Sequence, residues 1–152
     1  MIPLLLFLSL IPSGNTNGEF GKASVFAIHG DKYNPDDKPL ACESRIIRKH
    51  GHTYWQKILT HGVAHRTLPC GSKIRVYIIG KKRVRSSYAY VVDRGPYGVV
   101  NNGKWRLRRK LLSGERYRGI LDVLAPLAKK LNVSGIFFVV VKIISPRKIA
   151  YS

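Results

Sequence analysis

The apolar residues of this chain are grouped in short β-branched runs, and this grouping constrains the fold more than any other feature. Residues 136–144 are almost continuously apolar, and residues 73–79 alternate between apolar and polar side chains. Residues 84–92 return as a similar run after the turn Gly80-Lys81-Lys82. Runs of this length are typical of sheet strands and are too short to cross a bilayer as helices. We therefore expect a mainly β protein.

The remaining segments complete a small fold. Residues 125–131 predict a helix, because Pro126 suits its first turn and Asn132 can end it. At 152 residues the chain has room for one domain. Five or six short strands with one or two short helices favour a small β-barrel. The expected divisions are a leader and linker at 1–22, a barrel domain at 23–145 and a tail at 146–152. Within the barrel domain we expect a first strand at 23–28, a short helix around 54–59, and loops at 29–39 and 93–118.

The first residues resemble a secretion signal. Residues 2–11 form an apolar run that ends at Pro12-Ser13-Gly14. The run has the size of a signal-peptide core and is too short to span a bilayer, although no Lys or Arg precedes it. The alternatives are a buried N-terminal strand and an incorrectly assigned start. We expect an exported protein of the periplasm or cell envelope, without a membrane span.

The chain contains two cysteines, Cys42 and Cys70. In an exported protein an even number favours a disulfide, whereas in the cytosol the pair would be buried thiols. Because the export signal and a bridge support each other, we predict a Cys42–Cys70 disulfide. Neither cysteine lies in a Cys-x-x-Cys pair and the histidines are scattered, so we expect no metal site. Nucleotide-binding and serine-hydrolase motifs are absent from the sequence, and no cofactor is expected.

The charge balance favours polyanionic partners. The chain has 27 Lys and Arg against 8 Asp and Glu, a formal net charge of +19. The cations are densest at residues 81–83 and 106–110. Nucleic acid, anionic lipid and anionic wall polymers are all attracted by such a field, so charge alone does not choose among them.

Three titratable residues stand at positions where chemistry is plausible. Asp93 ends an apolar run, where it could be reactive or could cap the following turn. Asp122 lies between Leu121 and Val123, so desolvation could raise its pKa, or it could serve helix N-terminal electrostatics. His65 lies at an expected strand-to-turn junction, where a structural role competes with a catalytic one.

Five short segments together point to one family. They are Ala-Ser-Val-Phe at 23–26, Pro-Leu-Ala-Cys at 39–42, Val-Ala-His-Arg-Thr-Leu-Pro-Cys-Gly-Ser at 63–72, Val-Val-Asp-Arg-Gly-Pro-Tyr at 91–97 and Ile-Leu-Asp-Val at 120–123. In this order they resemble the RlpA-like proteins, over residues 23–144. The resemblance implies a six-stranded double-psi β-barrel, related to the expansin, barwin and family 45 glycoside hydrolase barrels.

The resemblance also implies an activity on peptidoglycan glycan strands. Members include lytic transglycosylases, which cleave between N-acetylmuramic acid and N-acetylglucosamine and leave a 1,6-anhydro end. By position in the motifs, Asp122 is expected as the acid and base, Asp93 as a second carboxylate or turn organiser, and His65 as a supporting group. The residues expected to line the substrate groove are Arg66, Arg94, Tyr97 and Trp105.

The chain also departs from the family pattern. Cys42-Glu43-Ser44-Arg45 and a basic insertion at 46–61 replace a Gly-Glu-x-Phe/Leu-Asp segment, and Leu124 stands where a serine is usual. A non-catalytic, expansin-like wall-binding module is therefore the alternative function. A third possible function is charge-driven binding of nucleic acid or of anionic surfaces. We expect a monomer that binds peptidoglycan and anionic wall polymers, and no specific nucleic acid.

Overall fold

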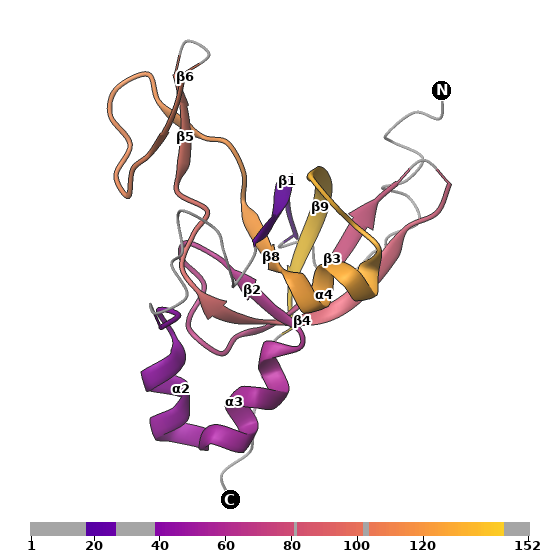
Figure 1. Cartoon of the computed structure of the whole chain (residues 1–152). Helices are drawn as coiled ribbons and strands as arrows, with labels where there is room; N and C mark the ends of the chain where they lie inside the picture. Colours follow the sequence, from indigo (N-terminus) through magenta and orange to yellow (C-terminus); the bar gives the residue numbers. More distant parts are fainter. Residues whose placement is uncertain (1–17, 27–38, 81, 102–103, 145–152) are drawn as a thin grey trace, which may run out of the picture.

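A closed six-stranded barrel forms the centre of the molecule in the computed structural model, which describes residues 18–26, 39–80, 82–101 and 104–144 (Figure 1). The strands follow one another around it in the order β1-β8-β2-β4-β3-β9. The expectation of a mainly β protein is confirmed. The barrel strands are β1 (Gly18–Phe26), β2 (Gly62–Ala64), β3 (Lys73–Ile79), β4 (Arg85–Asp93), β8 (Leu121–Leu124) and β9 (Ile136–Ile143).

Two parallel pairings hold together parts of the chain that are distant in sequence. β1 runs parallel to β8, and β2 runs parallel to β4, while the other four neighbouring pairs are antiparallel. Because side chains alternate along a strand, each strand sends one set into the barrel. Ile74, Val76 and Val141 belong to this inner set and are fully buried or nearly so. The alternation seen at 73–79 in the sequence is thus the inner and outer face of β3.

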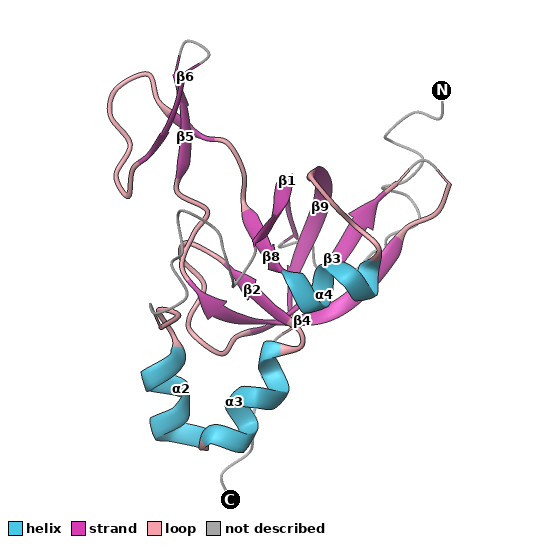
Figure 2. Cartoon of the chain, in the orientation of Figure 1, coloured by secondary structure: helices cyan, strands magenta, loops and turns pink. Residues whose placement is uncertain are grey.

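Three helices lie in the described part of the chain, one more than the one or two expected (Figure 2). The helix that was not expected is the first one, which begins directly after Cys42 and continues into the basic insertion. Its Glu43 lies in the first turn and its cations in the last, an arrangement that suits the helix dipole. Ile46 on this helix and Trp55 on the next are buried against the core. The helices are α2 (Glu43–His50), α3 (His52–Leu59) and α4 (Ala125–Leu131).

Two expected loop regions are strands in the structure. β1 begins at Gly18, within the expected linker, because residues 18–24 pair with β9. The segment at 93–118 contains a separate three-stranded sheet in the order β6-β5-β7. Its strands have two to four residues each, and β6 and β7 contain cations, so they lack the apolar periodicity that marks the barrel strands. They are β5 (Gly98–Asn101), β6 (Lys104–Leu107) and β7 (Arg116–Tyr117).

The predicted disulfide is present. Cys42 and Cys70 are joined, with their Cα atoms 5.4 Å apart. The bridge ties the start of α2 to the loop between β2 and β3, and Cys42 is completely buried. It therefore fixes the helical insertion against the barrel.

No helix in the described ranges is long and apolar enough to cross a membrane. The signal-like run at 2–11 and the tail at 146–152 lie outside the described residues, as does most of the expected loop at 29–39.

Loss of the disulfide is expected to destabilise the fold. For the 28-residue separation, Cys42→Ser/Cys70→Ser should lower the free energy of unfolding by about 3–4 kcal/mol. Urea denaturation with and without reductant measures this difference. The doubly substituted protein should not respond to reductant, and an unchanged wild-type midpoint under reduction would contradict a stabilising bridge.

Candidate functional site

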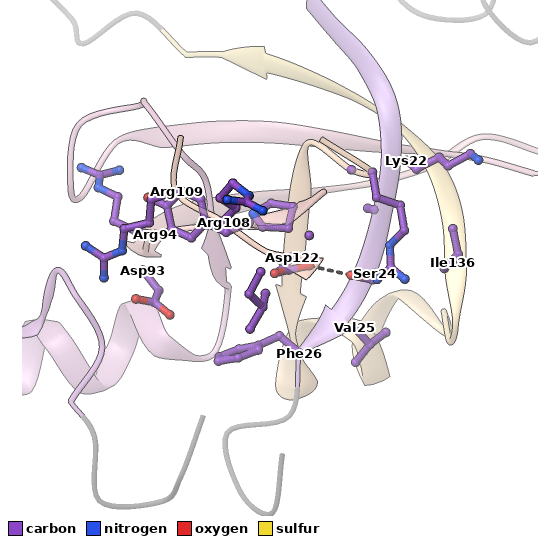
Figure 3. Close-up of a pocket in the computed structure, with 18 residues that line it drawn as sticks. Lys22, Ser24, Val25, Phe26, Asp93, Arg94, Arg108, Arg109, Asp122 and Ile136 are labelled. Atoms are coloured by element: carbon purple, nitrogen blue, oxygen red, sulfur yellow. Dashed lines mark hydrogen bonds between the residues drawn. The ribbon is translucent and has the colours of Figure 1, made fainter. Parts of the chain in front are cut away.

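A cleft of about 780 Å³ opens where β1 and β8 lie beside the Asp-Arg-Gly-Pro segment that follows β4 (Figure 3). Part of its wall comes from the three-stranded sheet and the loop after β6. Residues from distant parts of the chain therefore meet in one concave surface. The polar and charged residues that line it are Lys22, Ser24, Asp93, Arg94, Tyr97, Arg108, Arg109, Arg118 and Asp122.

Asp122 is a partly buried acidic residue of the cleft lining. It lies on β8 directly opposite Ser24 of β1 in the parallel pairing. The Ser24 hydroxyl donates a 2.5 Å hydrogen bond to Asp122 Oδ1, which fixes the orientation of the carboxyl group. The other oxygen, Oδ2, lies near Gly95, where an added Cβ would come within 3.6 Å of it. Gly95 has a φ of +139°, which favours glycine, and its missing side chain leaves space beside Oδ2.

Burial raises the pKa of Asp122 above the ordinary aspartate value. The Asp93 carboxylate adds to this effect by repulsion, which disfavours a second negative charge nearby. The Ser24 hydrogen bond and the positive charges of Arg118 and Arg66 act in the opposite direction. Desolvation is the largest of these influences, so Asp122 holds its proton to higher pH than an exposed aspartate does.

Asp93 is the second carboxylate in the cleft lining. It is the last residue of β4, and its Oδ1 accepts a 2.8 Å hydrogen bond from the Ala41 amide. The neighbouring Cys42 amide donates to the Val92 carbonyl at 3.2 Å. Asp93 thus helps to attach the segment before α2 to the barrel, and its carboxylate also influences Asp122.

His65 is buried and takes part in a structural network. Its Nδ1 accepts hydrogen bonds from the Thr67 and Leu68 amides, both at 3.1 Å. Because Nδ1 is an acceptor, the ring proton lies on Nε2, which donates to Glu19 Oε2 at 2.9 Å. His65 therefore shapes the turn after β2 and binds it to β1. Glu19, which lies in the linker predicted from the sequence, is thus the hydrogen-bond partner of His65.

Arg66 joins three parts of the cleft wall. Its Nη1 donates to the Pro96 carbonyl at 2.8 Å and to the Gly119 carbonyl at 2.5 Å. Its guanidinium also lies 3.9 Å from the centre of the Tyr117 ring. Burial lowers the pKa of Arg66, but these partners all suit the charged form.

Arg94 braces the turn after β2. Its Nη1 donates to the carbonyls of His65 and Leu68, and its Nη2 lies 3.4 Å from Cys70 Sγ. The Asp-Arg-Gly-Pro and His-Arg-Thr-Leu-Pro-Cys segments are therefore linked to each other by hydrogen bonds. Their arginines support the cleft wall in addition to contributing charge.

The structure brings together four of the seven expected catalytic and binding residues in the cleft lining: Asp93, Arg94, Tyr97 and Asp122. His65 and Arg66 do not line the cleft and instead bond the turns that form its wall. The side chain of Trp105 is outside the described part of the structure, although its backbone pairs with Val100. No group of three metal-binding side chains occurs among the described residues.

Sequence reasoning missed the role of Ser24 in this site. Ser24 belongs to one of the segments that carry the family resemblance, so that segment was the available signal. The contact itself requires the parallel register of β1 and β8, which pairs residues 98 positions apart. Tyr97 packs beside Tyr117, with ring centres 6.4 Å apart, a contact that equally depends on the unexpected small sheet.

The raised pKa of Asp122 predicts a pH-dependent stability cost. The pKa of Asp122 is higher in the folded protein than in the unfolded chain. Its contribution to folding stability is therefore complete below the unfolded pKa and is lost as pH rises through the folded pKa. Asp122→Asn keeps an acceptor for Ser24 but cannot ionise. Relative to the wild type, the free energy of unfolding of this variant should therefore increase from about pH 4 upward and then level off.

Urea denaturation of both proteins between pH 3 and pH 8 measures this difference. A difference that does not change with pH, or one that moves in favour of the wild type at higher pH, would contradict a raised pKa for Asp122.

No protein-family model matches this chain, and no curated protein matches its sequence.

Proposed function

We propose that this chain is an exported RlpA-like protein with a double-psi barrel, and that it cleaves peptidoglycan glycan strands as a lytic transglycosylase. The observation that carries the proposal is the partly buried Asp122 carboxyl, which lines an open cleft and whose pKa is raised. A carboxyl group that keeps its proton to higher pH than an exposed aspartate is better suited to act as a general acid. The disulfide supports export, because such bridges persist in oxidising compartments.

One carboxyl group is sufficient for this reaction. Asp122 donates its proton to the glycosidic oxygen that leaves as the bond to the anomeric carbon breaks. The resulting carboxylate then accepts the proton of the C6 hydroxyl of the same muramic residue, whose oxygen bonds to the anomeric carbon. The products are a 1,6-anhydro end and a new free hydroxyl on the other fragment, and Asp122 is protonated again.

The surroundings of Asp122 support both halves of this cycle. Burial favours the protonated form that begins the reaction, while the Ser24 hydroxyl and Arg118 stabilise the carboxylate that forms midway. Because burial and these two partners act in opposite directions, the protonated and ionised forms of Asp122 are closer in free energy than they would be with burial alone. Such a balance suits a group that serves as acid and then as base.

The cations of the cleft suit an acidic polymer. Lys22 lines it from β1, and Arg108 and Arg109 line it from the loop that follows β6. Peptidoglycan carries carboxylates on its muramic residues and peptides, so its strands are attracted to such a surface.

Binding without cleavage is the second candidate. Only Asp93 and Asp122 supply carboxylates to the cleft lining described here, and Asp93 already accepts a backbone hydrogen bond. A cationic cleft with a poorly placed acid would bind wall polymers and leave them intact, as an expansin-like module does.

Digestion of purified sacculi separates these functions. The full chain should release muropeptides with 1,6-anhydro ends, detected by mass spectrometry of the soluble fraction. Asp122→Asn should lower this release about 100-fold or more, the usual effect of losing a general acid. Glu43→Gln removes a carboxylate from α2, outside the cleft, and should retain full activity.

Two results would contradict the proposal. Sacculi that bind the wild type but release no fragments would indicate the binding module. Fragments with reducing ends and no anhydro ends would indicate hydrolysis.

A further inference from the structure

The three-stranded sheet and the loop between β6 and β7 form a basic arm, residues 98–101 and 104–118, which projects away from the barrel (Figures 1 and 2). From residue 104 to residue 118 the sequence contains seven cations and one acid. This is the densest positive segment of the chain. The cations are Lys104, Arg106, Arg108, Arg109, Lys110, Arg116 and Arg118.

The single acid of the arm is turned away from solvent. The Glu115 side chain is 6% exposed, and its Oε2 lies 3.3 Å from Arg108 Nε. Oε2 also accepts a 2.8 Å hydrogen bond from the Leu112 amide, and the Glu115 amide donates back to the Leu112 carbonyl at 3.0 Å. Gly114 adopts a φ of +79° within this tight turn. Glu115 thus organises the loop, and the outer surface of the arm is left cationic.

Three leucines of the arm are exposed among these cations. Leu107 is 52% exposed, Leu111 is 42% exposed and Leu112 is 56% exposed. The hydrogen bond from the Leu112 amide to Glu115 fixes the backbone of Leu112. The Leu112 side chain is therefore exposed in a defined loop conformation. Exposed leucines at the end of β6 and in the loop that follows it favour an interaction surface on the projecting arm.

We propose that the basic arm binds the surface of an anionic lipid bilayer. The leucines would enter the boundary between headgroups and acyl chains, while the surrounding cations contact the anionic headgroups. A soluble polyanion would satisfy the cations but would leave the leucines in water. Exposed leucines interleaved with cations along one projecting segment therefore favour a bilayer over nucleic acid or a wall polymer.

This surface goes beyond the proposed catalytic function and does not depend on it. Leu107 and Arg109 also line the cleft, so an arm bound to a bilayer would hold the cleft next to the lipid surface. The arm would act as a peripheral contact and would not span the membrane.

Cosedimentation with vesicles tests the proposal without any glycan present. The full chain should bind vesicles of phosphatidylglycerol and phosphatidylcholine much more strongly than vesicles of phosphatidylcholine alone. Leu107→Ser/Leu111→Ser/Leu112→Ser should lower the partition coefficient about tenfold or more, because the apolar contribution is lost. The remaining binding of this variant should be more sensitive to salt.

Matched variants separate the arm from the rest of the surface. Ile143→Ser changes an equally exposed apolar residue on β9 and should bind vesicles as the wild type does. Arg106→Gln/Lys110→Gln should weaken binding to phosphatidylglycerol while leaving the leucines in place. Thermal unfolding of each variant, which should match the wild type, verifies that the fold is intact.

Equal binding of the wild type to both kinds of vesicle would overturn the proposal. It would also be overturned if the triple leucine variant bound anionic vesicles as tightly as the wild type and single-stranded polyuridylate competed with both proteins. In that case the arm would be a general polyanion site.

Discussion

The parallel pairing of β1 with β8 is the constraint on which the candidate site depends. It places Ser24 opposite Asp122, and the 2.5 Å hydrogen bond between them holds the carboxyl group in one orientation. The same pairing holds Asp122 partly buried in the cleft wall, and the loss of solvation raises its pKa. A shift of one residue in this register would send Asp122 to the other face of the sheet. The chemistry available to the cleft is thus a consequence of strand register.

The remaining motif residues act mainly as a frame around this carboxyl group. His65, Arg66 and Arg94 all bond backbone atoms of the turns that form the cleft wall. Their contacts link the turn after β2, the Asp-Arg-Gly-Pro segment and the loop that leads into β8. The Cys42–Cys70 bridge is attached to the same frame through Arg94. Because these turns are irregular backbone, side-chain donors and acceptors replace the hydrogen bonds that a sheet would supply.

Sequence reasoning succeeded where one periodic signal determined the local structure. The alternation at 73–79 predicted β3, and Pro126 with Asn132 marked the two ends of α4. It failed where a partner distant in sequence decides the conformation. Residues 18–22 look like a linker because they are polar and glycine-rich, yet they become strand through pairing with β9. The strands of the basic arm were missed for the same reason.

The site could be predicted in part. Asp93 and Asp122 were singled out as the two carboxylates of interest, and both line the cleft. Their environments could not be read from neighbouring residues alone. The carboxyl group of Asp122 owes its state to Ser24 and Arg118 as well as to burial, and Ser24 is remote in sequence. The bond between His65 and Glu19 likewise needs the closed barrel.

The protonation of Asp122 is the central claim of this account, and a carboxyl-carbon NMR titration of that residue measures it directly. The wild-type midpoint should lie above the ordinary aspartate value of 3.8. Ser24→Ala should raise it further, because a hydrogen bond to the carboxylate is lost, and Asp93→Asn should lower it, because a repulsive charge is removed. A wild-type midpoint at or below 3.8, or variant shifts of the opposite sign, would contradict the account.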